Sequence, residues 1–192
     1  MRALSKILIK FFQTFINRFK YKFDIPFDIE YINLPITYSC NARCVMCDIW
    51  KVNKEDQKKL NSEITVPQLI EFFEKNKSRL KRLKNIGITG GEPSLKENLI
   101  ELIRYLRKNY PQVRIGIQTH GLTPEKILPW ISEIYEVYPN VGIGVSLDGM
   151  RESHEKMRGI SKAFERTLET IRGVQEIGVK EITCGLTITK WN

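Results

Sequence analysis

The feature that most restricts the fold is an alternation of two kinds of segment, which begins near residue 34 and continues through the rest of the sequence. Short runs rich in Ile and Val alternate with longer segments whose apolar residues recur every three or four positions. Runs of the first kind are typical of strands buried on both faces, and segments of the second kind are typical of amphipathic helices. The expected strands are 34–38, 85–89, 113–118, 141–147 and 181–189.

Four helices are expected between these strands. Their start signals are capping boxes at Thr65 with Gln68 and at Ser94 with Glu97, a Thr-Pro pair at Thr123 and Pro124, and an apolar face from Phe164. The fourth helix is expected to end near Gly178. Repeated strand–helix–strand units give right-handed parallel connections, so we predict an α/β fold whose sheet is either open or a barrel. A dinucleotide-binding version is unsupported, because no G-x-G-x-x-G follows the first strand.

Residues 1–23 differ in character from the rest of the chain. They carry six Lys or Arg residues and no acidic residue, so only +3 of the net charge of +9 belongs to the other 169 residues. That mild charge, without a recognisable binding motif, argues against a nucleic-acid partner. Apolar residues at helical spacing, which indicate a basic amphipathic helix, are Leu4, Leu8, Phe11, Phe15 and Phe19.

This predicted helix has two alternative roles. Lys10 and Arg18 interrupt its apolar run too early for a membrane span, and it lacks the apolar core of a signal peptide. It either lies on an anionic membrane surface or packs on the domain or on a partner chain. We therefore expect a cytoplasmic protein, with peripheral attachment to the inner face of the membrane as one hypothesis. The crowding of three of the four cysteines also favours a reducing compartment.

Residues 40–47, CNARCVMC, contain those three cysteines, Cys40, Cys44 and Cys47. Thiolates suit zinc or iron–sulfur centres, but a structural zinc site needs four ligands. Outside this segment the candidates for a fourth are His120 and Cys184, and a cysteine in a strand is more often a small buried hydrophobe. With three thiolates, a [4Fe–4S] cluster keeps one iron free for a substrate or cofactor. A zinc-binding or catalytically inactive α/β binding module is the alternative.

Three further motifs follow predicted strands: GGEP at 90–93, QTHG at 118–121 and SLDG at 146–149. Because α/β proteins build their sites at the carboxyl ends of parallel strands, these motifs and residues 40–47 are expected to form one pocket.

The cysteine segment together with GGEP resembles the radical S-adenosylmethionine (SAM) superfamily, over roughly residues 34–192. The resemblance implies a partial (β/α) barrel with five of six strands, incomplete at its C-terminus, after an N-terminal helix at 1–23 and a linker at 24–33. It also implies that Cys40, Cys44 and Cys47 hold a [4Fe–4S] cluster, and that SAM completes the coordination of the open iron.

The resemblance further implies contacts with SAM at Met46, Gly90, Gly91, Glu92, Pro93, Gln118, Ser146 and Arg158. The carboxylate of Glu92 suits the ammonium group of SAM, and the planar guanidinium of Arg158 suits its carboxylate. Two positions depart from the pattern: Met46 stands where an aromatic residue is usual, and His120 where Asn is usual. No catalytic residue is assigned.

The chemistry implied is reductive cleavage of SAM to a 5′-deoxyadenosyl radical, which abstracts a hydrogen atom from the substrate. An external one-electron donor, such as a flavodoxin or ferredoxin, is then required. The substrate is unidentified, and the SLDG and QTHG segments resemble the branch of the family that modifies peptides and proteins.

Overall fold

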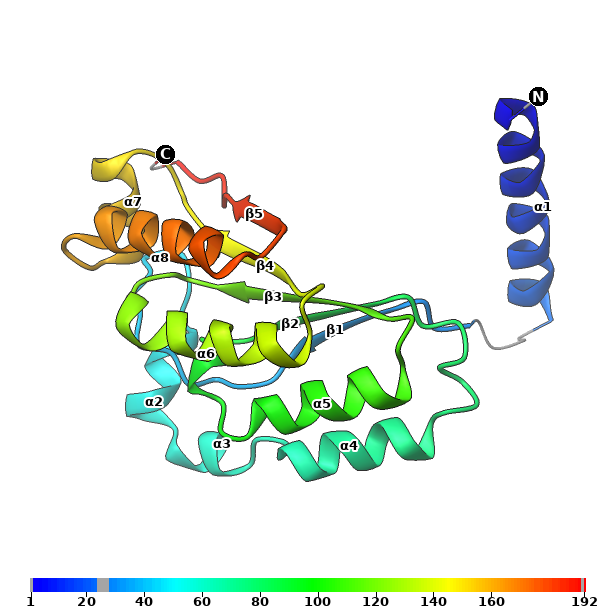
Figure 1. The fold of residues 1–192 in the computed structure, drawn as a ribbon, viewed down its shortest axis with the longest axis horizontal. Helices are drawn as coiled ribbons and strands as arrows, with labels where there is room; N and C mark the ends of the chain where they lie inside the picture. Colours follow the sequence, from blue (N-terminus) through cyan, green and yellow to red (C-terminus); the bar gives the residue numbers. More distant parts are fainter. Residues whose placement is uncertain (1, 24–27, 191) are drawn as a thin grey trace.

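The computed structural model describes residues 2–23, 28–190 and 192. A helix near the N-terminus precedes an α/β domain whose five described strands form one parallel sheet in sequence order (Figure 1). The strands are β1 (Tyr31–Pro35), β2 (Asn85–Thr89), β3 (Arg114–Thr119), β4 (Gly142–Ser146) and β5 (Glu181–Gly185). The helices are α1 (Arg2–Lys22), α2 (Val52–Glu55), α3 (Gln57–Asn61), α4 (Val66–Lys75), α5 (Leu99–Asn109), α6 (Pro124–Val137), α7 (Arg151–Arg158) and α8 (Ala163–Ile177). Short 3₁₀ turns are η1 (Ile49–Lys51) and η2 (Pro93–Leu95).

The predicted class is confirmed, because parallel strands in sequence order with intervening helices form a partial (β/α) barrel. The second strand has the predicted bounds, and the third and fourth differ from theirs by one residue at each end. The first strand begins at Tyr31, inside the segment predicted as a linker, and ends at Pro35. The fifth ends at Gly185, four residues before the predicted end.

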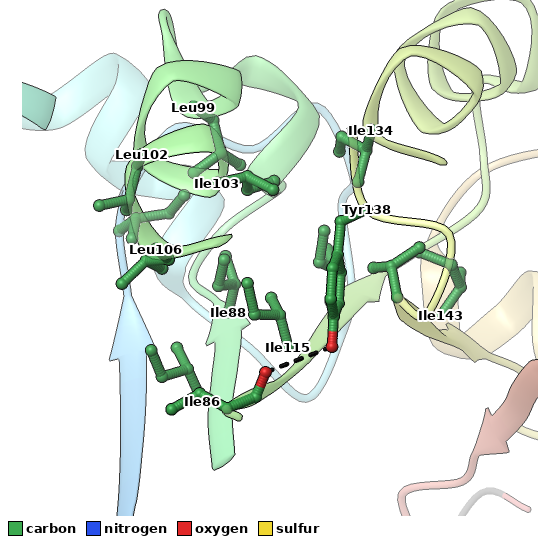
Figure 2. Close-up of a cluster of buried hydrophobic side chains, with 14 of the residues drawn as sticks. Ile86, Ile88, Leu99, Leu102, Ile103, Leu106, Ile115, Ile134, Tyr138 and Ile143 are labelled. Carbon is green, nitrogen blue, oxygen red and sulfur yellow. Dashed lines mark hydrogen bonds between the residues drawn. The ribbon is translucent and has the colours of Figure 1, made fainter. Parts of the chain in front are cut away.

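One face of the sheet packs on the helices. Alternate residues of the central strands, including Ile86, Ile88, Ile115 and Ile143, are buried in a single apolar cluster with α5 and α6 (Figure 2). At its edge the hydroxyl of Tyr138 donates to the backbone carbonyl of Val113 at 3.2 Å, a bond that Figure 2 shows as a dashed line. Burial of these Ile and Leu side chains gives the sheet a rigid support for the loops at its carboxyl end.

The opposite face of the sheet carries small and polar residues instead. Gly87 pairs with Gly116, and Gly116 with Gly142, so glycines lie side by side on three neighbouring strands. A Cβ added at Gly116 would meet no atom within 4 Å. This face lines a hollow of about 500 Å³, whereas a closed barrel of this type is normally filled with large branched side chains.

Two helix starts agree with the sequence and one does not. Thr65 and Gln68 form both bonds of the predicted capping box, and Pro124 begins α6. The capping box predicted at Ser94 and Glu97 is wrong, because α5 begins at Leu99, after a residue with a left-handed backbone. The backbone N–H and the hydroxyl of Ser94 instead donate to Glu92, whose carboxylate competes for the donors that a helix cap would use.

The described part of α1 leaves its aromatic rings uncovered. Phe11, Phe12 and Phe15 are 77%, 66% and 63% exposed. The basic residues Lys20 and Lys22 lie in the last turn of the helix. Within the described residues, no helix has both the length and the apolar character that crossing a membrane requires.

Candidate cofactor site

The cysteine segment is a loop that leaves β1 and is held by backbone hydrogen bonds on two sides. On one side, Gly91 N–H donates to Thr37 O at 2.7 Å and Glu92 N–H donates to Ser39 O at 2.8 Å, which joins the loop to the end of β2. On the other side, two N–H groups of the loop donate to the last turn of α7. These bonds are Arg43 N to Arg158 O at 3.2 Å and Val45 N to Met157 O at 2.9 Å.

Two glycines make this bracing possible. A Cβ at Gly91 would overlap the carbonyl oxygen of Ser39, so only glycine lets the end of β2 come this close to the loop. Gly159 ends α7 with φ of +64°, and a Cβ there would overlap the carbonyl oxygen of Arg43. The loop geometry therefore depends on glycines that lie far from the cysteines in sequence.

The four strand-end motifs meet around one cavity of about 150 Å³. Its lining comes from the cysteine loop, from the ends of β2, β3 and β4, and from α7 with the turn that follows the loop. The lining residues are Cys40, Ala42, Cys44, Met46, Cys47, Ile49, Trp50, Thr89, Gly90, Gly91, Gln118, Thr119, His120, Ser146 and Arg158. The structure thus brings together all three cysteines of the loop and six of the eight residues predicted to contact SAM.

Burial disfavours the thiolate form of two of the three cysteines. Cys40 and Cys44 are buried, whereas Cys47 is exposed. Burial raises the pKa of Cys40 to about 11, and it also raises the pKa of Cys44, although Arg158 opposes the second shift. Binding of iron at these sulfur atoms would release their protons.

The guanidinium of Arg158 lies beside the cysteines with an acidic partner. Its NH1 group is 3.6 Å from the sulfur of Cys44, and its NH2 group is 2.7 Å from Oδ2 of Asp148. Asp148 is fully buried, and its Oδ1 accepts a bond from Thr187 N–H at 3.0 Å. Among the described residues the buried Nε of Arg158 has no hydrogen-bond partner, so the group retains a donor for an anion.

Glu92 and Pro93 do not line the cavity, in contrast to the remaining predicted contacts. Glu92 is completely buried, and its carboxylate accepts hydrogen bonds from groups of the protein. The donors are Ser94 N–H and its hydroxyl, the hydroxyl of Thr119 and the backbone N–H of His120. This carboxylate therefore joins the ends of β2 and β3.

Gln118 and Ser146 form a pair on the floor of the cavity. The amide nitrogen of Gln118 donates to the hydroxyl of Ser146 at 3.1 Å. A Cβ at Gly144 would occupy the place of the Gln118 amide oxygen, so this glycine gives the side chain its room. Gln118 and Thr89 also line the hollow on the open face of the sheet, and the two cavities therefore adjoin.

Several side-chain contacts of the site were not predicted from the sequence. Asn41 and Trp50 hold the cysteine loop through side-chain contacts: Asn41 Oδ1 lies 2.6 Å from Nε2 of His120, and Trp50 Nε1–H donates to Cys44 O at 3.2 Å. The guanidinium of Arg43 stacks on the indole of Trp50, 5.1 Å from its centroid. Loop side chains carry no periodic pattern that would predict their contacts. The sequence indicated only that these residues lie in or next to the CNARCVMC segment.

The three cysteines of the loop line the same cavity. Within the described residues, no three His, Cys, Asp or Glu side chains converge closely enough for a single metal ion. A [4Fe–4S] cluster does not need three ligands around a single ion, because each thiolate binds a different iron. Cys184 is exposed on β5, contrary to the prediction of a buried hydrophobe, and it does not line the cavity. The donor set is therefore three thiolates with a cationic neighbour, which suits an iron–sulfur centre.

Comparisons with known proteins show the family of the chain. The radical SAM superfamily matches residues 34–190. Fe-coproporphyrin III synthase of Methanosarcina barkeri is 31% identical over 163 residues, which are 82% of this chain and 36% of that protein. GTP 3′,8-cyclase of Helicobacter pylori is 29% identical over 157 residues, 79% of this chain and 45% of the relative. Streptococcus suis SuiB bound to S-adenosylmethionine has the same fold, with a TM-score of 0.63 and 17% identity over 85% of this chain and 35% of SuiB.

The chain belongs to the radical SAM superfamily, a family that uses a [4Fe–4S] cluster and SAM. The relatives named above are enzymes, and the chain spans about a third to a half of their length.

Proposed function

We propose that this protein binds a [4Fe–4S] cluster through Cys40, Cys44 and Cys47 and cleaves SAM reductively. The observation that carries the proposal is the single cavity in which these cysteines meet residues from three further strand ends. The bound cluster and SAM supply a 5′-deoxyadenosyl radical, which removes a hydrogen atom from an unreactive C–H bond of the substrate. An external one-electron donor of the flavodoxin or ferredoxin type is the implied partner.

The residues of the cavity have distinct roles in this proposal. Gly90 and Gly91 line the cavity at the end of β2, where their backbone is available to the methionine end of SAM. Gln118 and Ser146 offer polar groups to the sugar of SAM, and Met46 offers an apolar, polarizable surface to its adenine. Arg158, which keeps an unused donor, holds the SAM carboxylate while Asp148 fixes its orientation.

The substrate is proposed to lie in the hollow of about 500 Å³ on the open face of the sheet. This hollow shares Thr89 and Gln118 with the cofactor cavity, so molecules in the two spaces would be neighbours. The curated relatives named above are called a coproporphyrin synthase and a GTP cyclase, which favours a small molecule over the peptide suggested by SLDG and QTHG. Which small molecule binds is left to experiment.

Anaerobic reconstitution with iron and sulfide tests the cluster. The wild-type chain is expected to hold about four irons and an equal amount of acid-labile sulfide. Cys40→Ser, Cys44→Ser and Cys47→Ser are each expected to lose most of this iron. Cys184→Ser is the matched control, because its sulfur lies on exposed β5 and outside the cavity, and it should retain the cluster.

Activity is then measured as 5′-deoxyadenosine formed from SAM with dithionite as the reductant. Product from the wild type and from Cys184→Ser, but not from the other three variants, supports the proposal. A wild-type chain that holds stoichiometric zinc and no iron would favour the zinc-binding alternative. A chain with a full cluster but no product would favour an inactive binding module.

The exposed aromatic face of α1 supports the peripheral membrane contact that its sequence suggested. Phe11, Phe15 and Phe19 are spaced at four residues, and each is more than half exposed. Residues 1–23 contain six basic residues and no acidic ones, which complements an anionic lipid surface. We propose that this helix lies on the cytoplasmic face of the membrane, with its rings in the interfacial layer.

Vesicle sedimentation tests this contact. Binding to vesicles with phosphatidylglycerol should exceed binding to phosphatidylcholine alone, and it should weaken with salt. The triple variant Phe11→Ser, Phe15→Ser and Phe19→Ser should lose this binding, while Phe72→Ser, at an exposed position of α4, should not. Equal sedimentation of all three proteins would refute the membrane contact, and a self-associating wild type would indicate a partner chain instead.

A further inference from the structure

The cysteine loop is fastened by a side-chain network that none of the proposed cofactor roles uses. Its members are Asn41 from the loop, Glu92 after β2, and Thr119 with His120 at the end of β3. Glu92 is 0% exposed and His120 is 5% exposed, so water does not compete strongly for these bonds. Three separate strand ends are thereby joined through one buried network.

The hydrogen bonds define which nitrogen of His120 carries the proton. The backbone N–H of Leu122 donates to Nδ1 at 2.9 Å, so Nδ1 is an acceptor and a neutral ring carries its proton on Nε2. Nε2 lies 2.6 Å from Oδ1 of Asn41 and 3.3 Å from Oε2 of Glu92. His120 therefore donates toward the loop, and its orientation is fixed from the opposite side of the ring.

Glu92 holds the base of this network. One of its oxygens accepts from the N–H and hydroxyl of Ser94, at 3.2 and 2.8 Å, and the other accepts from His120 N–H at 3.0 Å. The hydroxyl of Thr119 lies 3.0 Å from both oxygens. These donors fix the orientation of the carboxylate, and the bonds at both ring nitrogens fix that of the imidazole beside it. Asn41, which directly follows Cys40, is the point at which this rigid base reaches the loop.

We propose that His120 is a positioning residue, whose hydrogen bond to Asn41 holds Cys40 and the start of the loop in the geometry that receives the cluster. The inference rests on the proposed function, since it assigns a role toward the same cluster. It predicts that the bond affects how firmly iron is retained, more than how stably the chain folds. The interaction is between side chains, so it can be removed without touching the cysteines.

Two substitutions separate this role from general packing. In His120→Gln the side-chain amide nitrogen reaches the position of Nε2, so the donor toward Asn41 is preserved. In His120→Asn the shorter amide reaches only the position of Nδ1, and the donor is lost. The probe is the rate at which a ferrous chelator removes iron from anaerobically reconstituted protein. His120→Asn should lose iron about tenfold faster than the wild type, the factor expected for one lost hydrogen bond, and His120→Gln within about twofold of it.

A double-mutant cycle tests the partner. Asn41→Leu removes the acceptor and should accelerate iron loss as His120→Asn does, while the double variant should be no faster than either single one. Additive effects, or equal loss from His120→Gln and His120→Asn, would overturn the proposal. If His120→Asn does not fold, Asn41→Leu is compared with Asn41→Asp, which keeps an acceptor oxygen. The proposal then expects faster iron loss from Asn41→Leu, and equal iron loss from the two variants would overturn it.

The unfolding midpoint of the iron-free variants distinguishes the positioning role of His120 from a merely structural role. The proposal expects His120→Asn and His120→Gln to unfold alike without iron and to differ only in iron retention. Midpoints that fall in parallel with iron loss would overturn it. A wild-type chain that takes up no iron refutes the proposed function itself, whereas an intact cluster that is indifferent to position 120 refutes only the positioning role.

Discussion

Gly159 offers the sharpest test of how the cysteine loop is held. This residue ends α7 with φ of +64°, and a Cβ there would overlap the carbonyl oxygen of Arg43 in the loop. In Gly159→Ala the left-handed backbone costs about 1–2 kcal/mol. The loop must also move away, which weakens the bonds from Arg43 N–H and Val45 N–H to α7, worth about 1 kcal/mol each. The expected loss of unfolding free energy is about 2–4 kcal/mol.

Gly178 provides the matched control. It ends α8 with φ of +98°, so alanine meets a comparable backbone penalty. The nearest atom to its added Cβ is the hydroxyl of Tyr135 at 3.2 Å, the end of a side chain that can move. Gly178→Ala should therefore lose only about 1–2 kcal/mol and leave the cysteine loop in place.

Urea unfolding of the iron-free proteins measures the loss of unfolding free energy. Iron content after anaerobic reconstitution measures whether the cysteine loop keeps its place. Gly159→Ala should be the less stable variant, and it alone should bind less iron than the wild type. The reasoning is refuted if both variants hold equal iron, because the loop would then not depend on its contact with α7.

Two further predictions concern the cavity floor and the pH dependence of stability. Gly144→Ala displaces the Gln118 side chain and should weaken SAM binding to the reconstituted protein about tenfold in calorimetry, whereas Gly116→Ala, which meets no atom within 4 Å, should not. Burial lowers the pKa of His154 from 6.5 to about 4, and its Nδ1 accepts from Asp148 N–H, so the folded state requires a neutral ring. Stability should therefore be full above pH 6.5 and fall as the pH drops toward 4, and His154→Gln should flatten this dependence in urea unfolding.

The elements that the sequence predicted well are those with a local cause. In strands β2 to β4, Ile and Val alternate with Gly and polar residues, and the bounds of these strands agree within one residue. The expectation that they are buried on both faces was wrong, because one face packs on the helices and the other lines the open hollow. The start of β1 was missed because no residue of this strand is fully buried, so Tyr31 looks like part of a polar linker. Helix α7 was missed as well, since RESHEKMR has almost no apolar face.

The site was predictable in its ligands and less so in its supports. The strand-end position of their motifs predicted Gly90, Gln118 and Ser146 in one pocket, and the resemblance to the radical SAM superfamily added Arg158; the structure brings the four residues together. The resemblance implied a contact of Glu92 with SAM, but it did not predict the partners of Glu92 within the protein. These partners, Thr119 and His120, are distant in sequence, and no local pattern encodes that contact.

The supports also explain why the loop differs from a small zinc domain, in which the metal supplies most of the folding energy. Here the residues around the cysteines bond to the end of β2 and to the last turn of α7, both of which are anchored by packed elements. The backbone carries most of these bonds, and Gly91 and Gly159 permit them by having no side chain. A loop braced in this way is built before any iron arrives, so the protein without its cluster should keep the three sulfur atoms facing the same cavity.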